Sequence, residues 1–208
     1  MLDQDFFTNR PTERIAADLL GHELLYQGEN GTVGGLIVET EAYLGDLDTA
    51  AHAFGHRKSS ANAALFSEPG TLYFYTMRGL ILMNLICQPA GTPQGVLLRA
   101  IQPTQGEAKM RELRPQPGEE VTNGPAKLTQ ALGVTNLQWN NVSLAESPFS
   151  ITDQRRLIPQ EIGTAPRVGV SAGAWQDREL RFYVAGNAYV SGMRKRYMNW
   201  ATQGWLQA

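Results

Sequence analysis

The 208-residue sequence contains one cysteine and three histidines, and this scarcity excludes several kinds of chemistry. A single cysteine, Cys87, cannot form an internal disulfide, and its apolar neighbours indicate a core residue rather than a nucleophile. The histidines, His22, His52 and His56, form no His-Glu-x-x-His motif, and no thiolate cluster is available. We therefore expect no metal site.

Phosphate-binding glycine loops of the Walker or Gly-x-Gly-x-x-Gly type are also missing, and so is a Gly-x-Ser-x-Gly nucleophile motif. The sequence therefore predicts no nucleotide cofactor. No apolar run is long enough to cross a bilayer, and the first residues lack the basic and apolar regions of a signal peptide. We expect a soluble cytoplasmic protein, associated with the nucleoid if its source is bacterial, with no membrane contact.

The overall charge is low, but it is unevenly distributed along the chain. Eighteen basic and twenty acidic residues give a net charge of −2. Residues 1–50 hold two bases and ten acids, 2 − 10 = −8, so the remainder carries 16 − 10 = +6. Such a division is compatible with one basic surface on an acidic protein or with scattered solvated charges. The end from Met193 onward is both basic and aromatic.

The apolar periodicity and the turn residues predict strands that follow one another without regular intervening helices. The predicted fold is therefore α+β: a single mixed domain over residues 1–208, with a largely antiparallel, curved sheet and flanking helices. Helices are predicted at Pro11–Leu20, Thr104–Leu113 and Pro125–Leu132, and a short one at Ala61–Phe66. Strands are predicted at Glu23–Tyr26, Val33–Tyr43, Thr71–Tyr75, Leu80–Ile86, Gly95–Ile101, Arg167–Val170 and Leu180–Val184, with a possible bulge at Gly34-Gly35 and a functional or disordered loop between Gly45 and Pro69.

The segment Val38–Tyr43 is the most informative part of the sequence. Side chains alternate faces along a strand, so Glu39, Glu41 and Tyr43 would share one face. Buried carboxylates need a partner, and Arg99, in an equally apolar strand, needs an anion that Glu39 or Glu41 would supply. A structural ion pair and a catalytic group explain this pattern equally well.

The aromatic residues nearby also have two interpretations. Tyr43, Tyr73 and Tyr75 on strands are typical of cross-strand packing, and His52 alone is typical of a loop. Together, two tyrosines and a histidine could sandwich a planar heterocycle while a carboxylate oriented by an arginine activates water. That combination outlines a pocket for base excision.

With these residues in view, the sequence resembles a known family, the alkyladenine (3-methyladenine) DNA glycosylases of the mammalian type, which has bacterial members. The resemblance extends in order over most of the chain. Its motifs are Ile37-Val38-Glu39-Thr40-Glu41-Ala42-Tyr43-Leu44-Gly45, Ala50-Ala51-His52, Pro69-Gly70-Thr71-Leu72-Tyr73-Phe74-Tyr75, Met83-Asn84, Val96-Leu97-Leu98-Arg99-Ala100, Gly124-Pro125-Ala126-Lys127-Leu128, Arg167-Val168-Gly169-Val170 and Leu180-Arg181-Phe182-Tyr183-Val184.

The resemblance implies a role for each matching residue. Glu41 would be the general base and Arg99 would help to hold the attacking water. A flipped base would lie among Tyr43, His52 and Tyr75, while Asn84 would crowd the exocyclic amino group of guanine. One residue fewer separates Gly79 from Asn84 here than in the family.

The DNA contacts implied by the resemblance lie elsewhere in the sequence. Gly124 and Lys127 match a segment that faces DNA, and a helix start attracts phosphate. The position at which family members insert a tyrosine into the duplex is Arg78 here, so Arg78 or Met77 would fill the gap. The family activity is hydrolysis at a damaged purine in double-stranded DNA, such as 3-methyladenine, 7-methylguanine, hypoxanthine or ethenoadenine, by a monomer without cofactor or obligate protein partner. The absence of a lysine from the matched pocket segments predicts an abasic product without strand cleavage.

Two other functions are compatible with parts of the pattern. A sugar glycosidase could use Glu39 and Glu41 as its acid and base, because an i, i+2 spacing on a strand separates the backbones by roughly 6.5–7 Å. This alternative leaves Arg99 and the aromatic residues unexplained. A noncatalytic nucleic-acid-binding domain of the same fold would be indifferent to Glu41→Gln.

Overall fold

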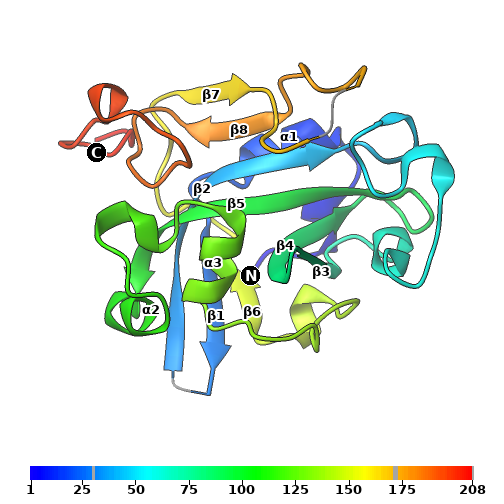
Figure 1. Cartoon of the computed structure of the whole chain (residues 1–208), viewed down its shortest axis with the longest axis horizontal. Helices are drawn as coiled ribbons and strands as arrows, with labels where there is room; N and C mark the ends of the chain where they lie inside the picture. Colours follow the sequence, from blue (N-terminus) through cyan, green and yellow to red (C-terminus); the bar gives the residue numbers. More distant parts are fainter. Residues whose placement is uncertain (30, 171–172, 208) are drawn as a thin grey trace.

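The computed structural model describes residues 1–29, 31–170 and 173–207. Within these residues the chain forms one eight-stranded sheet in which every pairing is antiparallel, flanked by three α-helices (Figure 1). This confirms the predicted α+β class. The strands are β1 (Glu23–Gly28), β2 (Gly31–Tyr43), β3 (Leu72–Met77), β4 (Leu80–Cys87), β5 (Gln94–Gln105), β6 (Phe149–Ile151), β7 (Ile162–Ala165) and β8 (Arg181–Val184).

Strand β2 is the centre of the sheet, whose main order is β3-β4-β5-β2-β1-β6. One edge of β2 pairs with β5 over most of its length. The other edge pairs with β1 from Gly31 to Leu36 and then with β8 from Glu39 to Glu41. The two acidic residues of the Val38–Tyr43 segment are therefore enclosed between β5 and β8.

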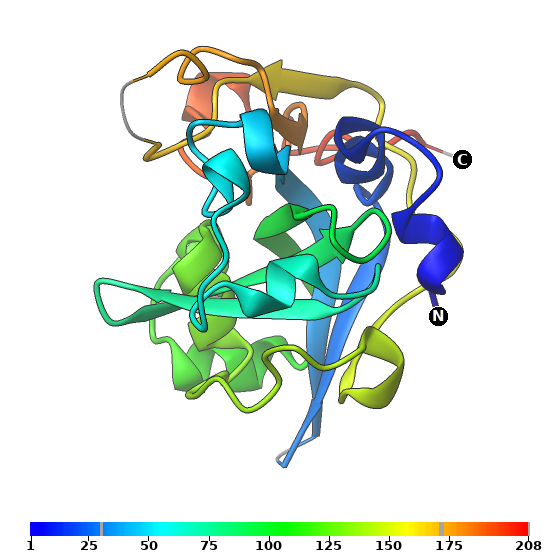
Figure 2. The same cartoon turned by 90° about the vertical axis from the view of Figure 1, so that its right-hand side faces the viewer.

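The helices cover both faces of this sheet. They are α1 (Thr12–Asp18), α2 (Glu107–Leu113) and α3 (Pro125–Ala131). Figures 1 and 2 show α1 behind β2 and β5, and α3 in front of the sheet. The apolar face of α1, with Ile15 and Ala16, is fully buried, and so are Leu128 and Ala131 of α3. Short 3-10 turns complete the described helical structure: η1 (Gln4–Phe7), η2 (Gly45–Leu47), η3 (Phe54–His56), η4 (Ala63–Phe66), η5 (Gly118–Val121), η6 (Leu144–Glu146) and η7 (Lys195–Tyr197). Among the residues described, none of the helices combines the length and apolarity of a membrane span.

Two irregularities shape β2 and β5. The pairing register of β2 with β5 shifts between Gly34 and Gly35, where the sequence predicted a possible bulge. Only glycine fits at position 34, because a Cβ there would lie 2.1 Å from the carbonyl oxygen of Leu24. Further along, Val38 on β2 and Arg99 on β5 are each left out of the pairing. Bulges of this kind redirect side chains and are common beside active sites.

Some predicted boundaries were wrong. Arg167–Val170 is a turn rather than a strand, because the Arg167 side chain is buried in an ion pair and the Val168 amide bonds to a carboxylate, as described below. Thr104 belongs to β5, and α2 begins only at Glu107. Strands β6 and β7, of three and four residues, were missed because such short segments carry little periodicity.

The predicted long loop between Gly45 and Pro69 is folded into the turns η2, η3 and η4. Buried Asn62 fixes it, since its amide nitrogen donates to the carbonyls of His52 and Arg57. A small apolar cluster lies beneath this segment and is separate from the main core. Its members are Ala53, Ala64, Leu65, Phe66, Tyr73 and Ile86.

Candidate active site

Glu41 lies near the end of β2 and its side chain is completely buried. Its Oε1 accepts a hydrogen bond from the Val168 amide at 2.8 Å and lies 3.0 Å from Nη1 of Arg99. Its Oε2 accepts from the Tyr43 hydroxyl at 2.9 Å. Burial raises the pKa of Glu41, and the Arg99 cation, the Val168 amide and the Tyr43 hydroxyl partly oppose that rise.

Arg99 connects the two acids of β2. Besides its contact with Glu41, its Nε donates to Oε1 of Glu39 at 2.7 Å and its Nη2 donates to Oγ of Ser191 at 3.1 Å. Sequence reasoning expected one of the two glutamates to partner Arg99, and the structure shows that both do. The bulge at Arg99 directs the guanidinium toward both side chains from the neighbouring strand.

Glu39 has a different environment from Glu41 although it lies only two residues away. Its carboxylate accepts from Arg99, from Nη1 of Arg181 at 3.2 Å, and from both the amide and the hydroxyl of Ser191. A carboxylate has about four acceptor positions. Three of the four donors to Glu39 share its Oε1, and Glu41 has fewer donors, since its Oε2 accepts only from the Tyr43 hydroxyl.

All four residues predicted to bind the base line one cavity next to Glu41. The lining consists of Tyr43, Ala51, His52, Leu65, Tyr73, Tyr75, Asn84, Pro93 and Gly95. The rings of His52 and Tyr75 meet edge to face at 4.6 Å, and Tyr73 stacks on Tyr75 at 5.5 Å. The cavity volume is about 30 Å³, far below the roughly 300–1,000 Å³ of typical ligand pockets.

The cavity side chains are uncharged at neutral pH. Burial lowers the pKa of His52 below its ordinary value of 6.5 and raises the pKa of Tyr75 to about 12. Burial also raises the pKa of Tyr43. Nδ1 of His52 lies 2.9 Å from the Tyr73 hydroxyl, which fixes the imidazole ring. The cavity thus offers neutral aromatic faces, with the acid of Glu41 behind Tyr43 rather than in the cavity wall.

A second buried ion pair, which sequence reasoning missed, supports Tyr43. Both terminal nitrogens of Arg167 donate to the two oxygens of Asp48, at 2.6 and 2.8 Å, and both side chains are fully buried. Asp48 also accepts from the amides of Leu44 and Ala50. The pair therefore joins the end of β2, the segment that carries His52, and the turn whose Val168 amide binds Glu41. The Arg167-Val168-Gly169-Val170 motif contained this signal, but its apolar residues favoured a strand.

The residues predicted to contact DNA lie outside the cavity. Met77 and Arg78 form the tip of the β3–β4 hairpin, which projects to the left in Figure 2. Arg78 and Gly79 both have positive φ, 53° and 78°, as a tight hairpin turn requires. Gly124 and Lys127 lie at the start of α3, where Nζ of Lys127 donates to Glu120 and Asn123.

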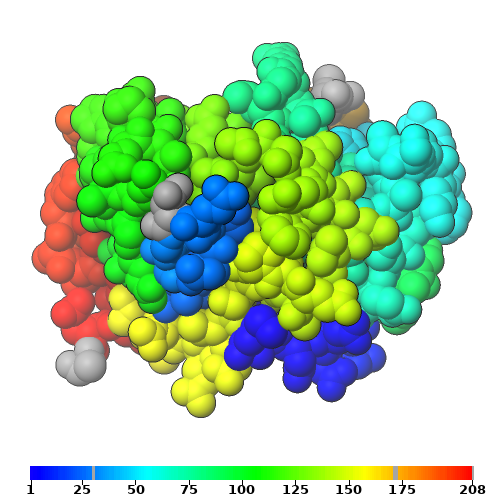
Figure 3. All heavy atoms as spheres, turned by 90° about the horizontal axis from the view of Figure 1, so that it is seen from below, coloured from blue at the N-terminus to red at the C-terminus, as the bar shows by residue number. Residues whose placement is uncertain are grey.

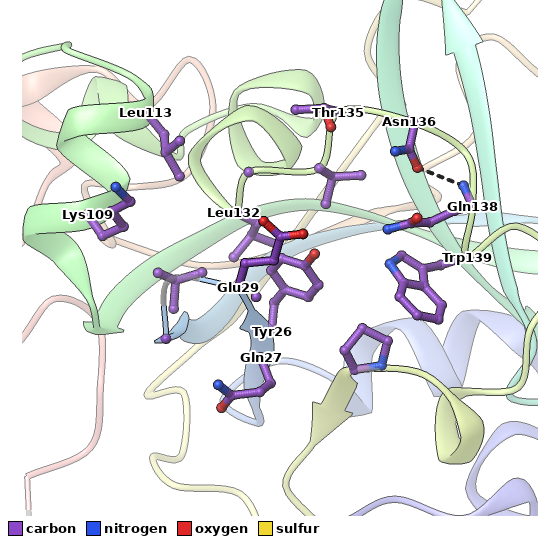
Figure 4. Close-up of a pocket in the computed structure, with 16 residues that line it drawn as sticks. Tyr26, Gln27, Glu29, Lys109, Leu113, Leu132, Thr135, Asn136, Gln138 and Trp139 are labelled. Atoms are coloured by element: carbon purple, nitrogen blue, oxygen red, sulfur yellow. Dashed lines mark hydrogen bonds between the residues drawn. The ribbon is translucent and has the colours of Figure 1, made fainter.

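A larger depression lies on another part of the surface (Figures 3 and 4). Its volume is about 620 Å³, and Tyr26, Glu29, Lys109 and Trp139 are among the residues around it. None of the ten predicted site residues, all of which the structure describes, lines it. The depression is therefore separate from the candidate active site.

The geometry, a buried acid and arginine beside a cavity with aromatic walls, is compatible with a hydrolase that acts on a planar base. The family model described as methylpurine-DNA glycosylase matches residues 5–188. Proteins provisionally named 3-methyladenine DNA glycosylase are similar over nearly their whole length. That of Latilactobacillus sakei is 48% identical over 203 residues, which are 97% of this chain and 95% of the relative. That of Lactobacillus delbrueckii is 46% identical over 207 residues, which are 98% of this chain and 99% of the relative. That of Staphylococcus carnosus is 42% identical over 201 residues, which are 96% of this chain and 97% of the relative.

The chain belongs to the methylpurine-DNA glycosylase family, in agreement with the resemblance seen in the sequence. It is accordingly a DNA glycosylase, a hydrolase whose substrate is DNA.

Proposed function

We propose that this enzyme hydrolyses the N-glycosidic bond of alkylated or deaminated purines in duplex DNA and leaves an abasic site. The observation that carries this proposal is the contact between Glu41 and its two neighbours. The carboxylate is held by Arg99 and bonded to Tyr43, whose ring faces the cavity with His52 and Tyr75. 3-Methyladenine, 7-methylguanine, hypoxanthine and ethenoadenine are the candidate bases.

The reaction requires the damaged nucleotide to leave the duplex, because the bond to be cut is inaccessible in stacked DNA. The purine would separate the rings of Tyr43, His52 and Tyr75 and stack between them. A positively charged alkylated purine interacts favourably with electron-rich rings. Extrusion costs a few kcal/mol and is easiest for weakly paired bases, so damage itself contributes to selectivity.

Glu41 would then act as general base. A water molecule beside it gives a proton to the carboxylate and attacks C1′ of the sugar, while the bond from C1′ to the purine breaks and its electrons go to the base. Arg99, with Nη1 3.0 Å from Oε1, would favour the ionised form of Glu41 against the effect of burial and would orient it. A positively charged purine such as 3-methyladenine or 7-methylguanine would leave as a neutral base, whereas uncharged hypoxanthine and ethenoadenine would also need a proton.

Asn84 would provide discrimination against guanine. It lies on β4 in the cavity lining, and its amide nitrogen donates to the Tyr73 carbonyl at 3.1 Å. This bond fixes the side chain, so a purine with an exocyclic amino group at that position would meet a rigid amide.

Duplex DNA would be held by the hairpin tip and by the start of α3. Met77 or Arg78 would fill the gap left by the flipped nucleotide, and Lys127 would exchange Glu120 for a phosphate. None of the described residues around the cavity is a lysine, so a Schiff base with the sugar has no donor there. This supports a monofunctional enzyme that does not cut the strand. We further expect the enzyme to act as a monomer.

A test uses duplex oligonucleotides that each carry one damaged purine. Base release with wild type, and strand breaks only after alkali, would support the proposal, and Glu41→Gln should release base at least about a hundredfold more slowly at the same protein concentration. Strand breaks without alkali would contradict the monofunctional mechanism. Release by Glu41→Gln at the wild-type rate, or cleavage of oligosaccharides instead, would favour a noncatalytic binder or a sugar glycosidase.

A further inference from the structure

We propose that the C-terminal segment Arg194–Trp200 is a second contact for the phosphate backbone of duplex DNA, beside the nucleotide that enters the cavity. The inference rests on the proposed function and goes beyond it, because this segment follows the residues 5–188 that the family model matches.

The segment lies in a part of the sequence that is more basic than the chain as a whole. Residues 180–208 contain Arg181, Arg194, Lys195 and Arg196 but no acidic residue, so their net charge is +4, while the whole chain is at −2. Arg194, Lys195 and Arg196 are exposed, and none forms an ion pair with an acid in the part of the chain that the structure describes. Three adjacent cations that no described acid neutralises form a surface that attracts phosphate.

Aromatic side chains are part of the same surface. Tyr197 and Trp200 are 59% and 57% exposed, although large aromatic residues are usually buried or at interfaces. The Arg196 guanidinium lies 4.7 Å from the centre of the Tyr197 ring, which orients this cation. Basic residues interleaved with exposed aromatic rings are a pattern that suits nucleic acid.

Both ends of the segment are fixed, so its charges are held in place. Ser191, before it, donates from its amide and its hydroxyl to Glu39. After it, Trp205 is almost completely buried and its indole donates to Gln102. The turn η7 between these anchors is thereby held on the body of the protein. A rigid cationic surface loses little conformational freedom when DNA binds.

The first anchor also places the segment close to the catalytic residues. The Ser191 hydroxyl accepts from Arg99 at 3.1 Å, and Arg194 follows only three residues later. Three residues span at most about 11 Å, so the Arg194 backbone lies within that distance of Ser191. In Figure 2, η7 lies at the upper left and the hairpin tip at the left, both away from the N-terminus, while Figure 1 shows η7 to the left of α3 and the hairpin to its right. A duplex that extends from the hairpin across this face would bring its flanking phosphates to this surface.

The test compares two triple variants that remove the same amount of charge. One is Arg194→Gln/Lys195→Gln/Arg196→Gln. The control is Arg14→Gln/Lys109→Gln/Arg156→Gln, which removes three cations that already pair with Asp18, Glu112 and Glu23. The equilibrium Kd for an undamaged duplex is measured over a range of salt concentrations, so the result does not depend on excision.

Removing one phosphate-binding cation lowers the slope of log K against log salt by about 0.9. The first variant should therefore reduce the slope by about 2 to 3 and bind at least tenfold more weakly in low salt, while the control changes the slope by less than about 1. Trp200 fluorescence should change on binding, and Trp200→Phe should remove that change. Equal effects of the two triple variants, an unchanged slope, or weaker binding only to single strands would overturn the inference. If wild type binds DNA in this way but releases no purine, the proposed function fails while this inference stands.

Discussion

The guanidinium carbon of Arg167 lies 4.5 Å from the centre of the Tyr43 ring, so one face of this tyrosine is covered by a cation. A flipped base can stack only on the other face. Arg167 is itself fixed by Asp48 and donates to the Ala42 carbonyl at 3.0 Å. The position of Tyr43 in the cavity wall therefore depends on a buried charge pair that does not line the cavity.

Breaking this pair should be costly. Asp48→Asn leaves the Arg167 cation buried without a full counter-charge, and we expect the free energy of unfolding to fall by about 3–5 kcal/mol in chemical denaturation. The exposed pair of Arg111 and Glu107 supplies the control, since Glu107→Gln should cost less than about 1 kcal/mol. The double variant Asp48→Leu/Arg167→Met should be more stable than Asp48→Asn. A cost for Asp48→Asn as small as that of the control would contradict this account.

The raised pKa of Glu41 has a consequence for stability. The native protein binds this proton more tightly than the unfolded chain, whose glutamate has an ordinary pKa near 4.5. The free energy of unfolding of wild type therefore declines as pH rises from that value through the raised pKa, and the decrease persists above it. Glu41→Gln lacks this decline, so the Tm of the variant minus the Tm of wild type should be larger at about pH 8 than at about pH 4, whatever its sign.

Thermal unfolding of three proteins across this pH range measures the effect. Glu146→Gln, which removes an exposed acid from the turn η6, should follow wild type. If the Tm difference between Glu41→Gln and wild type does not change with pH, the Glu41 carboxylate is not the source of the pH dependence of stability.

Protonation of Glu41 should stabilise the fold but reduce the catalytic rate. The general base must be ionised, so kcat/KM should fall as pH decreases through the raised pKa of Glu41. The Tyr43 hydroxyl lowers that pKa by donating to Oε2 of Glu41. Tyr43→Phe keeps the aromatic ring but should therefore move the acid limb of the pH profile, the decrease of kcat/KM at low pH, to higher pH. Tyr73→Phe, which removes a bond to His52 instead, should leave the limb in place. An acid limb that is the same in wild type and Tyr43→Phe would argue against Glu41 as the titrating base.

The hairpin tip offers a separate prediction about DNA. Arg78→Asn removes the guanidinium and keeps the turn, because Asn-Gly is the preferred pair for two positive φ values. If Arg78 fills the gap in the helix, excision from duplex DNA should fall about tenfold or more, while excision from a single strand, which needs no wedge, stays near wild type. Met77→Thr under the same conditions shows which of the two residues fills the gap. Equal decreases on duplex and single strand in both variants would exclude a wedge at this tip.

The sequence predicted the site better than it predicted the connections around the site. Alternation along β2 placed Glu39 and Glu41 on one face, and the apolar context of Arg99 required an acid, so their contact followed from elementary rules. Without the resemblance, the sequence could not distinguish the two acids. The donors that bind Glu39 include Arg181 and Ser191, which are 142 and 152 residues away along the chain. The Asp48–Arg167 pair was missed for the same reason, since its partners are 119 residues apart.

The most direct test of the central claim is the rate of a single turnover with Glu41→Gln. Wild type, Glu41→Gln and Glu146→Gln are each incubated in excess over a duplex with one hypoxanthine, after the Kd of each has shown that the substrate is fully bound. A general base contributes about 10²–10⁴ to the rate, so Glu41→Gln should release the purine at least about a hundredfold more slowly, with a Kd near that of wild type. A rate within tenfold of wild type at saturation would contradict the assignment of Glu41 as the group that activates water.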